Sequence, residues 1–240
     1  MSYLNTKPLV YGFEMGLMSE AIDLINDYPS NIAKKLMADE IDIGLVPVAI
    51  IPKLKEHYIV SDYGIGTMDE VASVCLFSDV PLNEVQNILL DYQSHTSVAL
   101  LKILLKEHWN ISPELTAGEE SYEQQISGNT AGLVIGDRAF RQRLKSKYVF
   151  DLGHAWKEMT GLPFLFAAWV SNKPFDETFK DEFDKANLFG LEHLGDVINH
   201  NPYEFYDLNT YYTENISYVL DDEKQKGLLK FLAYLDSMEG

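Results

Sequence analysis

The 240-residue sequence has little that a secreted, membrane-spanning or metal-cluster protein would need. Its single cysteine, Cys75, excludes an intrachain disulfide and a cysteine-based metal cluster. No apolar run approaches the roughly twenty residues of a membrane-spanning helix, and the longest, Phe164 to Val170, suits a buried strand. The N-terminus lacks the charged start and apolar stretch of a secretory signal. These absences predict a cytoplasmic protein.

Basic residues are scarce relative to acidic ones. The chain has 19 Lys and Arg against 37 Asp and Glu, which gives a formal charge of −18. Such a surface repels the phosphates of nucleic acids and anionic lipids, so we expect neither nucleic acid nor a membrane as a partner. A small anion remains allowed, because helix N-termini can bind one locally.

What the sequence does contain is an alternation of short apolar runs with helical patterns, which predicts an α/β fold. Apolar residues make up 46% of the chain, enough for a sizeable core. Helices are expected at about 31–39, capped by Ser30, at 96–109 and at 222–236. Strands buried on both faces are expected at 42–46, 58–61, 72–77, 87–91, 131–135, 148–152 and 164–170.

Two groups of strands, before and after about residue 85, predict two lobes. The mainly helical C-terminal third must cover a sheet face, and the first lobe is short of helices. We therefore expect a discontinuous first lobe of 1–85 plus 172–240 and an inserted second lobe of 86–171. The chain would cross between them near Ser78–Val85 and Ser171–Pro174.

Polar residues gather at two places where strands or turns meet helices. Asn5 and Thr6 form a turn before Pro8 and either face a cleft or cap the helix that follows. Four consecutive polar residues precede the clearest helix, and exposed amides and hydroxyls there can bind a carboxylate or simply cap the helix. These four are Ser94, His95, Thr96 and Ser97.

Other candidates have a structural interpretation beside the functional one. Asp137 follows a buried strand, and it either caps the next helix or holds a substrate hydroxyl. Ser73 lies inside an apolar strand, where a serine usually bonds to nearby backbone. The turn Gly161-Leu162-Pro163 feeds the last apolar strand or brings backbone close to a ligand.

No pattern indicates a metal or an organic cofactor. The histidines lack ligand spacing, and phosphate-binding glycine loops and the nucleophile elbow are missing. Four tyrosines near the C-terminus form an aromatic patch that we interpret as packing between lobes or a surface contact. They are Tyr203, Tyr206, Tyr211 and Tyr212.

Several motifs in order resemble those of the chorismate dehydratases in the vitamin K2 biosynthesis family. The opening SYLNTKPLVYG at 2–12 and the segment DLGHAWKEMTGLPFLFAAWV at 151–170 are the most specific in combination. Between them come EIDIGLVPVA at 40–49, SVCLFS at 73–78, LDYQSHTSVALLKILL at 90–105 and GLVIGDRAF at 132–140. The resemblance carried by these motifs covers about the first 170 residues.

The resemblance implies a two-lobed α/β fold of the type II periplasmic-binding-protein kind, with mixed sheets flanked by helices and a ligand cleft between the lobes. It also implies a hydro-lyase that converts chorismate to 3-[(1-carboxyvinyl)oxy]benzoate, with no metal or organic cofactor. Family members usually carry further residues before the opening motif, which form the first strand of the first lobe. Because the sequence starts at Met1, either the start is misassigned or trimmed, or that strand is shortened.

Site roles follow from the same resemblance. Asn5 and Ser73 match positions at the reacting ring and are expected to assist proton transfer. The start of the helix at 94–97 would bind one substrate carboxylate. Further substrate contacts are expected from Tyr3, Thr6, Ser94, His95, Thr96, Ser97, Asp137, Gly161, Leu162 and Pro163.

Two other functions stay open on the sequence. One is the sister enzyme that makes 1,4-dihydroxy-6-naphthoate, and the other is a non-catalytic protein of the same fold that binds a small anion. The sequence also allows a homodimer.

Overall fold

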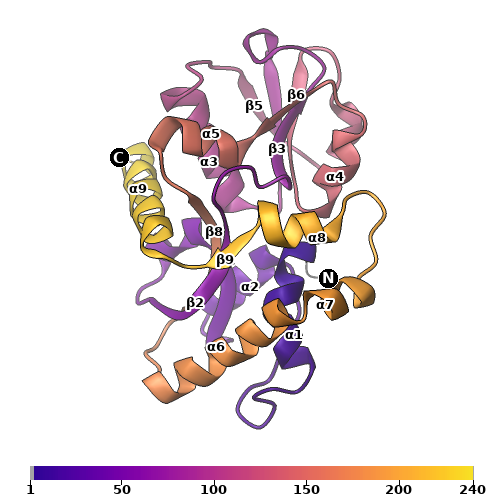
Figure 1. Cartoon of the computed structure of the whole chain (residues 1–240). Coiled ribbons are helices and arrows are strands. Elements are labelled where there is room, and N and C mark those ends of the chain that lie inside the picture. Colours follow the sequence, from indigo (N-terminus) through magenta and orange to yellow (C-terminus); the bar gives the residue numbers. More distant parts are fainter. Residues whose placement is uncertain (1–2, 240) are drawn as a thin grey trace.

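A computed structural model describes residues 3–239 and divides their strands between two sheets (Figure 1). The first sheet has the order β1-β8-β2-β9, and every pairing in it is antiparallel. Its strands are β1 Ile43–Pro47, β2 Tyr58–Thr67, β8 Phe164–Ser171 and β9 Ser217–Val219. The second sheet has the order β5-β4-β6-β3-β7 and mixes parallel and antiparallel pairs. Its strands are β3 Val74–Ser78, β4 Asn87–Leu90, β5 Glu114–Ala117, β6 Thr130–Ile135 and β7 Tyr148–Asp151.

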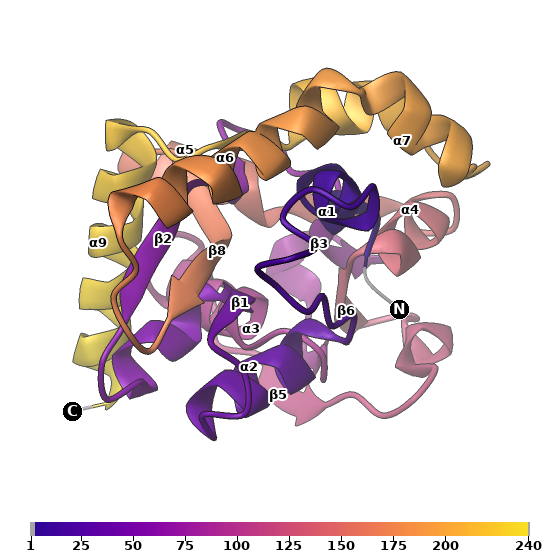
Figure 2. The same cartoon turned by 90° about the horizontal axis from the view of Figure 1, so that it is seen from below.

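Helices flank both sheets, as Figure 2 shows from below. The longer ones are α1 Lys7–Glu14, α2 Pro29–Met37, α3 His95–Glu107, α5 Leu152–Thr160, α6 Glu177–Glu192 and α9 Asp222–Glu239. Shorter helical pieces are η1 Leu4–Thr6, η2 Val48–Lys53, η3 Leu82–Glu84, η4 Tyr122–Gln125, α4 Asp137–Arg143, α7 Leu194–His200, α8 Leu208–Thr210 and the π-helical turn η5 Tyr211–Asn215. The predicted α/β class is confirmed.

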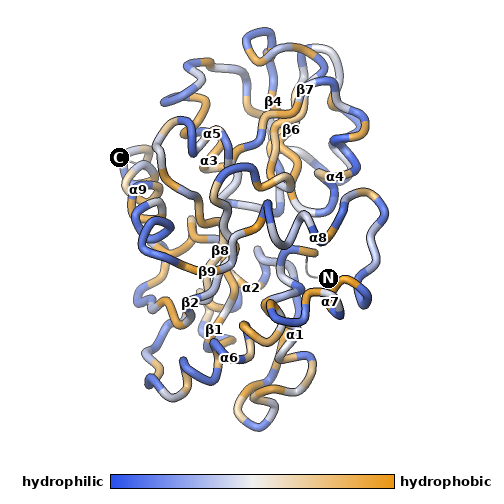
Figure 3. The backbone as a smooth tube through the Cα atoms, viewed as in Figure 1, coloured by the Kyte–Doolittle hydropathy of each residue, from blue (hydrophilic) through white to orange (hydrophobic). Residues whose placement is uncertain are grey.

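The apolar strands build the core between these layers. All five residues of β3 are buried, and so are the last five of β6, which explains why their sequences are apolar on successive positions. In Figure 3 the hydrophobic colour concentrates in strands such as β4 and β6. All seven predicted strands are present in the structure, whereas β5 and β9 were not predicted.

Two strands lie in a different sheet from the one their place in the sequence suggested. β3, within the predicted first lobe, pairs with β6 and β7 of the second sheet. β8, within the predicted second lobe, pairs with β1 and β2 of the first sheet. Sheet membership therefore moves the two chain crossings to residues 68–73 and 152–163. The C-terminal segment returns to the first sheet through β9, as expected.

The cap of α2 differs from the one predicted from the sequence. Tyr28, rather than Ser30, is the N-cap of α2, because Pro29 already occupies the first helical turn. β1 lies at the edge of its sheet. No helix within residues 3–239 is long and apolar enough to span a bilayer.

Candidate active site

The N-terminal turn η1 carries the first candidate residues. Thr6 occupies the N-cap position of α1, as the capping interpretation expects, but its hydroxyl donates to the carbonyl of Tyr3 (2.7 Å) and makes no bond to the helix. The side-chain oxygen Oδ1 of Asn5 is buried and has no hydrogen-bond partner among the described residues. A buried amide oxygen without a donor is costly, so Oδ1 of Asn5 is suited to receive a donor from a ligand.

The turn is held on both sides by side chains far away in the sequence. The carboxylate of Asp137 accepts from the Leu4 amide (3.1 Å). The phenols of Tyr212 and Tyr218 donate to the carbonyls of Leu4 and Asn5, each at 3.1 Å. Burial raises the pKa of both phenols, so they stay protonated donors at neutral pH. The backbone that presents Asn5 is therefore fixed independently of its side chain.

Ser73, the second catalytic candidate, lies immediately before β3 and is fully buried. Its amide donates to the Val71 carbonyl (2.7 Å), and its carbonyl accepts from the Gly136 amide (2.8 Å). Its side chain does not bond to nearby backbone as a structural strand serine would. Instead, Oγ accepts from the phenol of Tyr211 (2.7 Å), which comes from η5 near the C-terminus.

Consecutive residues at the start of α4 bring these two candidates together. Gly136 holds the backbone of Ser73, and Asp137 holds the backbone of Leu4 beside Asn5. Gly136, with φ of 62°, is the N-cap of α4, so the expectation that Asp137 caps this helix is wrong. A Cβ at Gly136 would lie 2.5 Å from the ring of Tyr3, so only glycine allows Tyr3 to approach this closely. Burial raises the pKa of the Asp137 carboxyl.

The N-terminus of α3 has its hydroxyls engaged within the protein. Ser94 caps the helix by accepting from the Ser97 amide (3.1 Å), and the two hydroxyls bond to each other (2.8 Å). The buried hydroxyl of Thr96 accepts from the Ala49 amide (3.1 Å), which ties α3 to the start of η2. His95 is exposed. The predicted anion site at this helix start therefore depends on the backbone amides at the positive end of the helix dipole, which can still attract a carboxylate.

Arg138 joins this helix start to the N-terminal turn, and sequence reasoning missed it. Its guanidinium bonds to the carboxylates of Asp91 (2.6 Å) and Glu123 (2.5 Å) and to the side-chain oxygen of Gln93 (3.3 Å). The Tyr3 phenol donates to the same oxygen of Gln93. Two carboxylates neutralise the cation, so Arg138 acts here by orienting Gln93 and Tyr3 rather than as a free charge for an anionic ligand.

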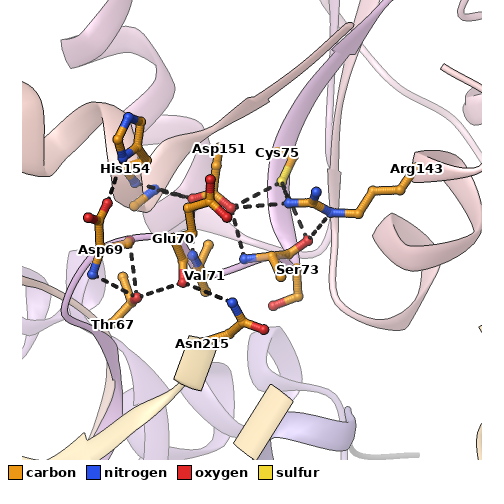
Figure 4. Close-up of polar contacts among 12 residues, drawn as sticks. Thr67, Asp69, Glu70, Val71, Ser73, Cys75, Arg143, Asp151, His154 and Asn215 are labelled. Atoms are coloured by element: carbon orange, nitrogen blue, oxygen red, sulfur yellow. Dashed lines mark hydrogen bonds and ion pairs between the residues drawn. The ribbon is translucent and has the colours of Figure 1, made fainter. Parts of the chain in front are cut away.

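The connector between β2 and β3 is fixed by Asp151, as the close-up in Figure 4 shows. The carboxylate of Asp151, at the end of β7, accepts from the amides of Val71 (3.1 Å) and Ala72 (2.8 Å) and from Gly153 (2.9 Å). Arg143 donates through Nε to the Ala72 carbonyl (2.9 Å) and through Nη2 to Oδ2 of Asp151 (3.3 Å). Both chain crossings between the sheets thus meet at one buried carboxylate.

The predicted turn Gly161-Leu162-Pro163 does not join this cluster. Its Pro163 carbonyl accepts from the indole of Trp156 (3.2 Å) and lies against Gly227 of α9. In Figures 1 and 2, α9 and α4 lie on opposite sides of the molecule. Gly161, with φ of 74°, ends α5, so the turn has a structural role in the fold.

A cavity of about 420 Å³ lies near β1, away from most of the candidate residues. Its walls include residues of α1, α2, β1, β8, α6 and the segment 21–27, among them Phe13, Trp169 and Phe183. Of the predicted site residues, Thr6 lines it. Neither Asn5 nor Ser73 lines this cavity, although Thr6 follows Asn5 directly in η1.

Comparison with known proteins assigns the family. The family model for menaquinone biosynthesis matches residues 1–237. The chain belongs to this family. The match extends through the C-terminal segment, beyond the first 170 residues whose motifs carry the resemblance. The chorismate dehydratase of Thermus thermophilus is 27% identical over 215 residues, which is 81% of this chain and 77% of that protein. The chorismate dehydratase of Campylobacter jejuni is 27% identical over 190 residues, 78% of this chain and 69% of that protein.

Solved structures agree with the predicted fold. Protein AF1704 from Archaeoglobus fulgidus superposes with a TM-score of 0.71 at 14% identity, covering 100% of this chain and 96% of that one. The periplasmic aliphatic sulphonate binding protein SsuA of Escherichia coli gives a TM-score of 0.63 at 12% identity, covering 99% and 90%. At these identities the likeness establishes the periplasmic-binding-protein-like fold of this member of the menaquinone biosynthesis family.

Proposed function

We propose that this protein is a hydro-lyase that removes water from chorismate to give 3-[(1-carboxyvinyl)oxy]benzoate. The family match and the names of both relatives support this reaction. The structural observation that carries it is the unpaired, buried Oδ1 of Asn5, on a turn whose backbone is joined through Gly136 and Asp137 to that of Ser73. We also propose a cytoplasmic location, supported by the single cysteine, since disulfide-poor chains are typical of reducing compartments.

The reaction breaks the bond between a ring carbon and its hydroxyl oxygen and removes one ring proton, so that water leaves and the ring becomes aromatic. Aromatisation supplies much of the driving force, and the protein mainly holds, orients and desolvates the substrate. In this proposal the Asn5 amide and the Ser73 hydroxyl hydrogen-bond to the reacting ring. Neither group is a strong base, so the proposal gives a carboxylate of the substrate a share in the proton transfer.

The two carboxylates of chorismate require positive potential in a protein of net charge −18. The N-terminal end of α3, capped by Ser94, is the proposed place for one of them. Because Ser73 is fully buried, the proposal also requires the layers around it to separate when substrate enters. A two-lobed fold allows such a hinge motion about its crossing segments.

The test is incubation of the purified protein with chorismate in EDTA, followed by mass spectrometry. The expected product is lighter than chorismate by one water molecule and has the absorbance of a substituted benzoate. Unchanged chorismate would contradict the proposed reaction. Tight chorismate binding without a product would instead favour a non-catalytic binding protein of the same fold.

A further inference from the structure

Tyr211 belongs to a segment that the sequence motifs left without a function, and it contacts the second catalytic candidate directly. It is the first residue of the π-helical turn η5, and π-helical turns are frequent at functional sites. Its side chain is fully buried, and its phenol lies 2.7 Å from Oγ of Ser73. No other hydrogen bond of the Ser73 side chain is found within residues 3–239.

The backbone of Ser73 is already fixed on both sides. Its own carbonyl is held by Gly136, and its amide by Val71. The preceding residue, Ala72, has φ of 62°, a left-handed conformation that is unfavourable for alanine. Asp151 accepts from the amide of Ala72 and Arg143 donates to its carbonyl, so both polar groups of the Ala72 backbone are held. The remaining freedom of Ser73 is rotation about its Cα–Cβ bond.

The phenol of Tyr211 restricts this rotation. A serine hydroxyl has one proton to donate and two lone pairs to accept with. Burial raises the pKa of Tyr211 well above its usual value, so the phenol keeps its proton and donates it. With one lone pair of Oγ occupied by this donor, the proton of Ser73 is free to be donated elsewhere.

We propose that Tyr211 is a positioning residue, which orients the Ser73 hydroxyl so that its proton is donated to the substrate. This inference rests on the proposed role of Ser73 in dehydration. The donated hydrogen bond would stabilise negative charge that develops on the substrate as the ring hydroxyl departs. Tyr211 itself does not touch the substrate.

The test is Tyr211→Phe, which removes the phenol oxygen alone. The ring stays packed edge-on against Phe140, with 4.9 Å between the ring centroids. We expect kcat for chorismate to fall about ten- to a hundredfold, because the Ser73 hydroxyl loses the buried hydrogen bond that orients it. KM should change by less than about twofold, since the phenol does not bind the substrate. The matched control is Tyr206→Phe: its ring stacks on the same Phe140, and its phenol donates to Asn215 (3.0 Å) instead.

A double-mutant cycle with Ser73→Ala separates positioning from a general loss of structure. If Tyr211 acts through Ser73, Tyr211→Phe lowers kcat in the wild-type background and has no further effect in the Ser73→Ala background. Equal effects of Tyr211→Phe in both backgrounds, or a loss in kcat matched by Tyr206→Phe, would overturn the inference.

A crystal structure of Tyr211→Phe provides a second measurement that needs no turnover. The expected result is a Ser73 side chain spread over more than one rotamer, where the wild type has one. A single, unchanged Ser73 rotamer in the variant would contradict the inference even if the wild-type protein proved inactive toward chorismate. If the wild type is active and Tyr211→Phe is equally active, the inference about Tyr211 is wrong, while the proposed reaction is still supported.

Discussion

Among single residues, Asn5 combines an ordered backbone with an unsatisfied side chain. Its carbonyl accepts from Tyr218, whereas its Oδ1 is buried without a partner in the described part of the chain. A group used for folding would be satisfied by the protein, and a group used for binding is satisfied by its ligand. The stability and the activity of the protein should therefore respond differently to changes at this position.

Asn5→Ala should not lower the free energy of unfolding, because no hydrogen bond of Oδ1 is lost and a costly unpaired oxygen is removed. Asn187→Ala is the matched control. The buried Asn187 amide accepts from Trp169 (2.8 Å) and donates to the carbonyl of Phe183 (2.8 Å), so its loss should cost about 2–4 kcal/mol. Urea denaturation measures both. Equal losses for the two variants would show that Asn5 is a structural residue.

The buried carboxyl of Asp137 gives a pH-dependent prediction. Burial raises its pKa in the folded state, so the stability that its neutral form contributes is present below the unfolded value and is lost as the pH rises through the raised pKa. Asp137→Asn keeps an oxygen for the Leu4 amide and does not ionise. We expect the variant to gain stability relative to wild type as the pH rises above about 4. A stability difference that is the same in acid and at neutral pH would contradict this assignment.

The sequence offers candidate roles only for residues that belong to a motif, and these roles remain predictions. The family motifs point to Asn5 and Ser73, and the start of α4 binds the backbone of Ser73 and of Leu4, the neighbour of Asn5. Tyr211 and Arg138 were missed because their partners are distant in sequence; Tyr211 and Ser73 are 138 positions apart. Composition and periodicity contain no signal for such a pair.

At the scale of elements, the capped start of α3 allows the contribution of Ser94 to stability to be measured apart from its proposed contribution to substrate binding. Ser94→Ala removes the cap bond to the Ser97 amide and should cost about 1 kcal/mol. Asp176→Ala is the control, because Asp176 caps α6 through the Phe179 amide (2.8 Å) and is not part of the proposed site. Both variants should lose similar stability in urea denaturation, while KM for chorismate should rise for Ser94→Ala alone. Equal KM values for the two variants would remove α3 from the substrate site.

The elements that sequence reasoning missed are those without an apolar pattern. All four residues of β5 are exposed, and β9 has three residues, so neither contains a run that predicts a strand. The cap of α4 was assigned to Asp137 by residue type, although a glycine at positive φ serves there. Buried strands such as β3 and β6 were predictable because a short run of successive apolar residues is typical of a strand covered on both faces.

Across the whole molecule, Asp151 connects the two segments in which the chain passes between the sheets. It binds the amides of Val71 and Ala72 in one crossing and of Gly153 in the other. The lobe division predicted from the sequence followed strand order along the chain. Sheet membership depends instead on which strands pair, and β3 and β8 pair across the expected boundaries. The number of crossings was predictable and their positions were not.

Asp151→Asn should destabilise the protein by about 2–4 kcal/mol, because the new amide nitrogen cannot accept from a backbone donor or bind Arg143. Asp207→Asn is the control: this exposed residue caps α8 through the Thr210 amide (2.7 Å), and asparagine caps as well as aspartate. Urea denaturation compares the two. An unchanged free energy of unfolding for Asp151→Asn would show that the crossings are held by other contacts.

The decisive experiment for the proposed dehydration compares turnover and binding of chorismate in the wild type and in Asn5→Ala. We expect the wild type to release the aromatic product, and Asn5→Ala to lose most of its turnover even at chorismate concentrations that saturate the variant. Unchanged turnover in Asn5→Ala would contradict the proposed mechanism, because the buried oxygen that the described residues leave unpaired would then have no part in the reaction.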